Sequence, residues 1–210
     1  MTETANVFVF GASGHAKVVI DAIERAGLAR VLFVCDDARE KRGASLMGYP
    51  IVGRDDLLAR RGETRVGVVG IGDNAARAKV AHWLVENGCG LVSVVHPFAS
   101  VGREVAIAEG TVVMAGCVIN SGTKLGRNVI LNTGASIDHD CSVDDGVHIA
   151  PGARLCGGVS VGRGTLIGAG SIVIPGVRIG AGALIGAGST VLKNVPDGAR
   201  AAGNPCSLLS

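Results

Sequence analysis

The second half of the chain repeats every six residues. From Val101 to Pro196 it divides into 16 consecutive hexads without an insertion, and each hexad begins with Val, Ile or Leu. The fifth residue is always Val, Thr, Ala, Ser or Cys, and the fourth is Gly in 12 of the 16 hexads. A short fixed period indicates stacked repeats, because one such segment cannot bury its apolar face alone. This half is therefore predicted to form a column of coils.

The repeated positions have distinct physical roles. In a short extended segment the side chains alternate between faces, so a bulky aliphatic residue and a small residue at fixed places can both point inward. Gly or Asn at the fourth place allows a turn with positive φ. Cys117 and Cys141 occupy the fifth place and are predicted to be small core residues rather than reactive thiols.

Aromatic residues mark a boundary along the chain. All six of them lie at or before Phe98, whereas the chain contains 33 Gly. Large rings are an efficient way to fill an ordinary core, but they do not fit a narrow column of small and aliphatic residues. We therefore expect two domains, comprising residues 1–97 and 98–210.

The hexad pattern resembles that of the hexapeptide-repeat acyltransferases. This resemblance implies a left-handed parallel β-helix with three hexads per triangular coil. It also implies a homotrimer in which the active sites lie between neighbouring subunits.

The first hundred residues alternate between expected strands and helices. Strands are predicted at 7–10, 31–35, 66–71 and 91–95, and helices after Gly14, at 55–61 and at 74–85. This alternation predicts a small Rossmann-like parallel α/β sheet. Loops 11–15, 36–37 and 72–74 then meet at the carboxyl edge of the sheet, where ligands bind in such folds. Gly11 and Gly14 would let a phosphate approach the backbone at a helix start. The full GxGxxG pattern is missing, so the sequence only weakly supports NAD as the ligand.

A combination of motifs carries a more specific resemblance. The FGASGH turn, the Asp-Asp pair, the IGDN turn and the hexads together resemble the sugar O- and N-acyltransferases related to sialic acid O-acetyltransferases. Members of that family include N-acetyltransferases of nucleotide-linked 4-amino-4,6-dideoxy sugars, as in the bacillosamine and perosamine pathways. The resemblance extends from about Val7 to Pro205 and implies that the first domain binds a nucleotide-sugar. The implied contact residues are Ser13, Gly14, His15, Asp36, Asp37 and Gly72.

Histidine is scarce in the repeat. His139 and His148 are the two histidines among the hexads, and both occupy outward places. One coil before and after His139 stand Ser121 and Gly157, so small neighbours leave room for a ligand. An imidazole beside a carboxylate suits proton removal from an acceptor amine.

The family resemblance assigns roles to these residues. It implies that His139 is the general base, that Asp140 supports its basicity and that Asn132 is a neighbouring polar residue of the site. Relatives often carry Glu in place of Asp140, and Asp138 is an alternative partner for the imidazole. The cosubstrate is expected to be acetyl-CoA, and no metal is expected. The residues implied to meet the thioester or to line the CoA path are His148, the Gly157 backbone, Ala169 and Ala187.

Bulk properties exclude other classes of function. The net charge is +2 and no basic block occurs, which argues against nucleic-acid binding. Mean hydropathy is +0.42, yet no 18-residue apolar run lacks Gly or polar breaks, so no membrane span is expected. Six scattered Cys without a CxxC motif indicate reduced thiols, and the first residues do not read as a signal peptide. A cytoplasmic protein is therefore expected.

The leading hypothesis is direct attack of a sugar amine on acetyl-CoA, and three alternatives stand beside it. A sugar O-acetyltransferase would activate a hydroxyl with similar residues. A zinc enzyme of the γ-carbonic-anhydrase type would need a third ligand besides the two outward histidines, and it would leave the GASGH domain unexplained. A non-catalytic assembly or binding module would leave the paired IDHD and GVH motifs without a role.

Overall fold

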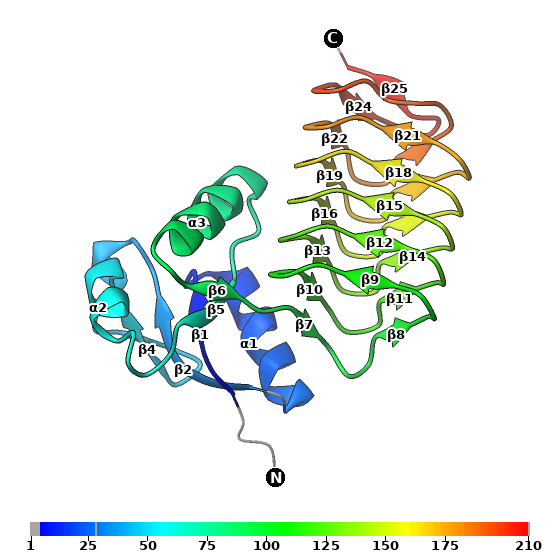
Figure 1. The fold of residues 1–210 in the computed structure, drawn as a ribbon. Helices are drawn as coiled ribbons and strands as arrows, with labels where there is room; N and C mark the ends of the chain where they lie inside the picture. Colours follow the sequence, from blue (N-terminus) through cyan, green and yellow to red (C-terminus); the bar gives the residue numbers. More distant parts are fainter. Residues whose placement is uncertain (1–4, 28, 210) are drawn as a thin grey trace. The chain divides into compact units, whose positions relative to one another are not determined.

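The computed structural model describes residues 5–27 and 29–209, which divide into two compact units, Met1–Pro97 and Phe98–Ser210. The first unit is an α/β sheet and the second is a parallel β-helix (Figure 1). The predicted combination of a Rossmann-like sheet and a left-handed parallel β-helix is confirmed.

The first unit holds a six-stranded sheet in the order β3-β4-β2-β1-β5-β6, parallel except for β3. Helix α1 packs on the face that carries Val7 and Val9, and α2 and α3 pack on the face that carries Phe8 and Phe10. The elements are β1 (Ala5–Phe10), α1 (Gly14–Ala26), β2 (Ala29–Cys35), the 3₁₀ turn η1 (Arg39–Lys41), β3 (Ser45–Leu46), β4 (Tyr49–Val52), α2 (Arg54–Ala59), β5 (Val66–Val69), α3 (Asn74–Glu86), β6 (Gly90–Leu91) and β7 (Val94–Val95).

Two parts of this unit differ from the expected pattern. The strand predicted at 91–95 is two short strands, β6 and β7, and only β6 belongs to the six-stranded sheet. The sequence between 38 and 53 contains a hairpin that periodicity did not predict, with Met47 and Gly48 at φ values of 51° and 87° in its two-residue turn. Its second strand, β4, extends the sheet beside β2.

The second unit stacks two-residue strands into three parallel sheets. Partners in neighbouring coils are 18 residues apart, as in the pairing of Ile119 with Ile137, so each coil contains three hexads. The last coil is shorter, because β22 pairs with β24 at a step of 16 residues, Leu184 with Arg200. Face 1 contains β10 (Val112–Val113), β13 (Ile130–Leu131), β16 (His148–Ile149), β19 (Leu166–Ile167), β22 (Leu184–Ile185) and β24 (Arg200–Ala202), followed by the antiparallel β25 (Ser207–Leu208). Face 2 contains β8 (Ser100–Val101), β11 (Val118–Ile119), β14 (Ser136–Ile137), β17 (Arg154–Leu155), β20 (Ile172–Val173) and β23 (Thr190–Val191). Face 3 contains β9 (Ala106–Ile107), β12 (Lys124–Leu125), β15 (Ser142–Val143), β18 (Ser160–Val161) and β21 (Arg178–Ile179).

The interior of the column follows the hexad positions. From Val113 to Val191 every first-place side chain is at most 3% exposed, and from Thr111 to Val195 every fifth-place side chain is buried. Val101, in the first hexad, is exposed instead, because no coil precedes it. Cys117 and Cys141 are buried core residues as predicted, and burial raises the pKa of the Cys117 thiol to about 11.

The fourth hexad place has a left-handed backbone in 15 of the 16 hexads, and Asn194 in the last hexad is the exception. Twelve of its glycines have positive φ, and so do three non-glycine residues, Glu104, Asn128 and Asp140, at 60°, 55° and 57°. A side chain in this conformation costs about 1 kcal/mol relative to Gly. Asp140 therefore stands where the repeat favours glycine, beside the candidate base.

Buried hydroxyl groups at the fifth place connect successive coils. The Thr165 hydroxyl donates to the Gly180 carbonyl at 2.6 Å and accepts the Ala183 N–H at 3.1 Å. Thr111 and Ser171 make equivalent pairs of hydrogen bonds. These hydroxyls satisfy backbone groups that would otherwise be buried without a partner.

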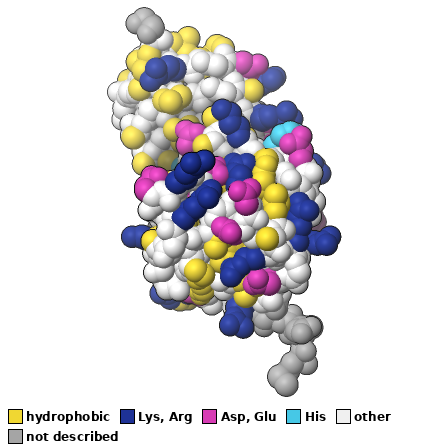
Figure 2. Space-filling model, turned by 90° about the vertical axis from the view of Figure 1, so that its left-hand side faces the viewer, with side chains coloured by type: hydrophobic (Ala, Val, Ile, Leu, Met, Phe, Trp, Pro, Cys, Tyr) yellow, Lys and Arg dark blue, Asp and Glu magenta, His cyan; other side chains and the backbone are white. Residues whose placement is uncertain are grey.

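The surface carries charges of both signs. Figure 2 shows Lys and Arg side chains interspersed with Asp and Glu on the face that it displays. Within residues 5–27 and 29–209, no helix is long and apolar enough to cross a membrane.

Candidate active site

His139 lies at the corner between face 2 and face 3, two residues after β14 ends. Its imidazole Nδ1 is 2.9 Å from the Asp140 Oδ2, and both side chains are exposed. The left-handed φ of Asp140 gives the chain the turn in which this side chain can reach back to the preceding ring. The Asp140 hydrogen bond, followed by the charge of Asp138, raises the pKa of His139 above its ordinary value.

Asp138 contacts the backbone of His139 rather than its ring. Its Oδ1 accepts the His139 N–H at 2.8 Å and the Asn120 side-chain N–H at 2.7 Å. The Asn120 hydrogen bond, with that of the His139 backbone, holds the pKa of Asp138 below its usual range. The structure therefore brings Asp140, and not Asp138, to the ring nitrogen.

Gly157 lies in the next coil, directly against the imidazole. A Cβ on Gly157 would stand 2.6 Å from both the Cε1 and the Nε2 of His139, too close for any real side chain. The neighbouring Gly158 N–H donates to the His139 carbonyl at 2.9 Å, which keeps the two corners in register. Glycine at 157 thus provides the space that the ring occupies.

Asn132 and His148 form a second polar pair. The Asn132 Nδ2 is 3.1 Å from the His148 Nε2, and the Asn132 Oδ1 accepts the Thr133 N–H at 2.8 Å. Because the amide nitrogen donates, Nε2 accepts and the proton of the neutral His148 ring lies on Nδ1. His148 points outward from face 1 and is half-buried.

The expected site residues of the β-helix fall on two different corners, apart from His148, which lies in β16 beside the second corner. The His139 corner comprises residues 120–122, 138–140, 156–158 and 174–176, between faces 2 and 3. The Asn132 corner comprises residues 132–134, 150–152, 168–170 and 186–188, between faces 1 and 2, and it includes Ala169 and Ala187. The whole of face 2 separates these corners within one chain. The expected site residues of one protomer therefore lie in two separate groups.

In the first unit the glycine-rich loop is tightly held. Gly11 has φ of 112°, and a Cβ there would stand 2.8 Å from Ile71, so only glycine fits. The Asp36 carboxylate accepts the Ala12 N–H at 2.6 Å and the Ala38 N–H at 2.9 Å. Lys41 lies 3.3 Å from the same carboxylate. Asp36 thus fastens the loop after β1 to the end of β2.

Asp37 faces outward in an ion pair that sequence patterns did not reveal. The guanidinium of Arg54 donates to both Asp37 oxygens, at 2.6 and 2.7 Å, and these bonds lower the pKa of Asp37. The same guanidinium lies 4.1 Å from the centre of the Trp83 ring and 5.2 Å from that of Phe10. Arg54 and Trp83 come from different helices and share no sequence motif, so spacing alone does not connect them.

The remaining loop residues cluster at the same edge. Ser13 is exposed and Gly14 begins α1, while a Cβ on Gly72 would stand 4.0 Å from the Cβ of the half-buried His15. The buried Arg77 donates to the Gly72 carbonyl at 3.0 Å and to the Asn74 Oδ1 at 2.8 Å, and thereby shapes the loop after β5. Burial lowers the pKa of Arg77 to about 10.

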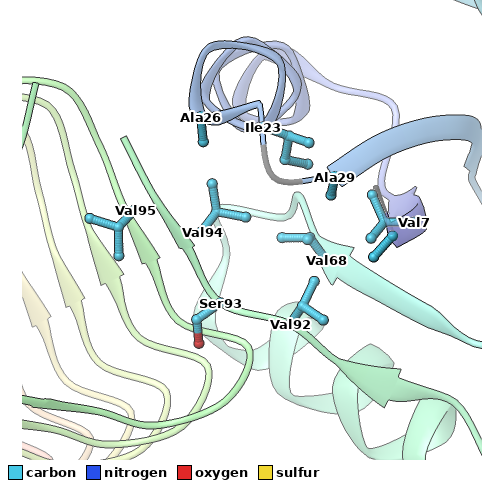
Figure 3. Close-up of a pocket in the computed structure, with 10 residues that line it drawn as sticks. Val7, Ile23, Ala26, Ala29, Val68, Val92, Ser93, Val94 and Val95 are labelled. Carbon is cyan, nitrogen blue, oxygen red and sulfur yellow. The ribbon is translucent and has the colours of Figure 1, made fainter. Parts of the chain in front are cut away.

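An apolar pocket of about 160 Å³ lies at the opposite edge of this sheet (Figure 3). It is lined by the first residues of β1 and β2, the end of α1 and residues 92–95. It contains no phosphate-binding groups, and it lies away from the helix start where a diphosphate binds best. Among residues 5–27 and 29–209, no group of three His, Cys, Asp or Glu side chains is arranged to hold a metal ion.

Comparisons with known proteins agree with this organisation. Residues 6–84 match the model of the PglD N-terminal domain, and residues 158–193 match that of the bacterial transferase hexapeptide. The GDP-perosamine N-acetyltransferase of Escherichia coli O157:H7 is 28% identical over 154 residues, covering 71% of this chain and 69% of that protein.

Solved structures match almost the whole chain, and two of them illustrate these relatives. One is a histidine-to-asparagine mutant of perosamine N-acetyltransferase from Caulobacter crescentus in complex with CoA and GDP-perosamine. It has a TM-score of 0.93 and 38% identity, and the match covers 99% of this chain and 98% of that one. The other is the acetyltransferase domain of PglB from Neisseria gonorrhoeae FA1090, with a TM-score of 0.90, 35% identity and coverage of 97% and 99%. The chain therefore belongs to the family of amino-sugar N-acetyltransferases that combine a PglD N-terminal domain with a hexapeptide-repeat β-helix.

Proposed function

We propose that this protein transfers an acetyl group from acetyl-CoA to the 4-amino group of a nucleotide-linked amino-dideoxy sugar. The observation that carries the proposal is the His139–Asp140 pair over Gly157, in a chain that matches perosamine N-acetyltransferase along nearly its whole length. The perosamine enzyme of the matched structure binds CoA and GDP-perosamine.

In the proposed reaction His139 acts through its Nε2. Because Nδ1 lies against the Asp140 carboxylate, the ring proton stays on Nδ1 and the Nε2 lone pair is available. The neutral sugar amine attacks the thioester carbonyl carbon, and Nε2 takes one N–H proton as the C–N bond forms. The tetrahedral intermediate then collapses and the C–S bond breaks. The departing CoA sulfur takes the proton from the imidazolium, which restores the base.

The thioester oxygen gains negative charge during this attack and needs donors. We propose that His148 and the Gly157 backbone meet the thioester, and that Ala169 and Ala187 line the CoA path. Small residues at the corner would allow the long pantetheine chain to run along the stacked coils. Asn132 would orient His148 through their 3.1 Å contact.

The loops of the first unit would bind the nucleotide-sugar. Ser13, Gly14, His15 and Gly72 lie around the start of α1, where backbone N–H groups and the helix dipole favour phosphates. Asp37, oriented by Arg54, is accessible to a nucleoside. Asp36 would act mainly by holding the Ala12 backbone in place.

Catalysis on this account requires a homotrimer with active sites between subunits. The two groups of expected site residues are half-sites on different corners of one chain, so a second copy must bring an Asn132 corner to a His139 corner. Face 2, between these corners, exposes Val118 and Ile172, and Leu192 follows at its edge; the three side chains are 38%, 37% and 46% exposed. Exposed apolar side chains on the face between two half-sites are suited to being buried in an interface with other copies of this chain.

An acceptor panel tests the function. The assay would measure free thiol release from acetyl-CoA with UDP- and GDP-linked 4-amino sugars and with free sialic acid. We expect turnover with a nucleotide-linked 4-amino sugar. Turnover with sialic acid alone would instead identify a sugar O-acetyltransferase and overturn the proposal.

A further inference from the structure

Asn120 stands one coil before Asp138 on the His139 corner. The pairing of β11 with β14 matches Val118 to Ser136 and Ile119 to Ile137, so the next residues, Asn120 and Asp138, stack as well. The Asn120 N–H donates to the Ile137 carbonyl at 2.9 Å, which holds this register up to the corner.

One carboxylate oxygen joins Asn120 to the His139 backbone. The Asp138 Oδ1 accepts both the Asn120 side-chain N–H, at 2.7 Å, and the His139 backbone N–H, at 2.8 Å. The Asn120 amide therefore holds the Asp138 side chain in the rotamer that captures the His139 N–H. Asn120, in the preceding coil, thereby fixes the orientation of the peptide between residues 138 and 139.

The orientation of this peptide decides where the imidazole lies. The ring must reach the Asp140 Oδ2 at 2.9 Å and also fit over Gly157, where a Cβ would approach within 2.6 Å of its Nε2. A small rotation of the peptide would move the ring away from one of these neighbours. Misplacement of a catalytic group by about 1 Å can reduce a rate about 100-fold.

We propose that Asn120 is a positioning residue for the base, acting through Asp138. The proposal rests on the function proposed above, in which His139 removes the proton from the acceptor. Asn120 itself touches neither the ring nor the Asp140 carboxylate in any contact of the described chain. Its influence is on the direction of the imidazole and not on the charge around it.

The surroundings of His139 allow positioning and charge to be separated. The charged groups that act on the imidazole are Asp138 and Asp140. The corners packed below and above it contribute uncharged side chains and glycines, namely Asn120, Ser121, Gly122, Cys156 and Gly157. Loss of the Asn120 amide leaves both carboxylates in place, so a positioning role predicts a lower kcat with little movement of the acid limb of the pH profile.

The test is a double-mutant cycle of Asn120→Ala and Asp138→Ala in the full-length protein. We expect each single variant to reduce kcat about 10-fold to 100-fold, with KM for acetyl-CoA little changed. The double variant should be no slower than Asp138→Ala, because Asn120 acts through that carboxylate. Additive losses, or an Asn120→Ala enzyme within about twofold of the parent kcat, would overturn the proposal.

A matched control is available on another corner of the same coils. The Asp145 Oδ1 accepts the Arg127 backbone N–H at 2.7 Å across the same 18-residue step, away from His139. Asp145→Ala should therefore keep the parent kcat. If Asn120→Ala does not fold, Asp138→Ala alone removes the same hydrogen bond, and normal kcat in it overturns the proposal. His139→Ala distinguishes failure of the proposed function from failure of this inference. Full activity of His139→Ala would refute the proposed function. An inactive His139→Ala enzyme beside an Asn120→Ala enzyme of normal kcat would refute only the positioning role of Asn120.

Discussion

At the scale of single residues, Asp140 has a left-handed backbone, which favours glycine, and a carboxylate that contacts the His139 ring, which glycine cannot provide. The fourth hexad place favours glycine because its backbone is left-handed, yet residue 140 is an aspartate with φ of 57°. The strain has a local explanation in the 2.9 Å contact with the His139 Nδ1. The sequence predicted a carboxylate partner for His139 but left Asp138 open, because both neighbours of a turn residue can reach it. Only the backbone geometry separates the ring contact of Asp140 from the backbone contact of Asp138.

Asp140→Gly and Asp140→Ala separate this chemistry from the strain. Both remove the hydrogen bond that raises the pKa of His139, and the neutral base exists only above that pKa. The acid limb of kcat/KM should therefore shift to lower pH in both variants, while kcat falls about 10-fold to 100-fold. The measurements are pH–rate profiles of both enzymes.

Stability should distinguish the same two variants. Glycine accepts positive φ freely, whereas alanine costs about 1 kcal/mol there. Denaturant unfolding should show Asp140→Ala to be less stable than Asp140→Gly by that amount. Equal stability would contradict the strain, and unchanged pH profiles would contradict the role of Asp140.

At the scale of elements, the β-helix was predictable and part of the α/β unit was not. Every hexad repeats the same local physics, so 16 copies of one pattern determine the inward positions with little ambiguity. The hairpin of β3 and β4 occurs once, and Ser45–Leu46 is too short to show a period. Arg54 and Trp83 escaped prediction because their contact joins separate helices through the tertiary fold.

The hydrogen bonds between coils predict the effect of Thr165→Val. The replacement keeps the volume but leaves the buried Gly180 carbonyl and Ala183 N–H without the Thr165 hydroxyl. We expect a loss of about 1–3 kcal/mol in the free energy of unfolding. Thr133→Val, at an exposed corner, should change it by less than about 0.5 kcal/mol. Equal effects in chemical denaturation would refute the role of the buried hydroxyl.

At the scale of the whole molecule, the aromatic boundary in the sequence corresponds to two different ways of building a core. Phe8, Phe10 and Phe33 fill the α/β sheet, while the β-helix is packed with aliphatic and small residues alone. The family resemblance implied active sites between subunits. The division of the expected site residues between two corners gives a physical reason for that arrangement.

Face 2 supplies a direct test of assembly. Ile172→Lys places a charge on an exposed apolar position of this face and should prevent trimer formation without disturbing the column inside it. Light scattering should report monomers with an intact circular dichroism spectrum and no acetyl transfer. Ser142→Lys, at the same hexad place on face 3, should remain trimeric and active. A trimeric, active Ile172→Lys protein would show that face 2 is not the interface.

Subunit complementation tests the central claim most directly. His139→Ala lacks the proposed base, and Asn132→Ala lacks the residue proposed to orient His148, so each protein alone should have little activity. When the two are unfolded, mixed in equal amounts and refolded, mixed trimers contain one interface with both corners intact. We expect recovery of about a quarter of the parent turnover. No recovery in mixed trimers of confirmed composition would mean that each active site lies within one chain, and would contradict the account.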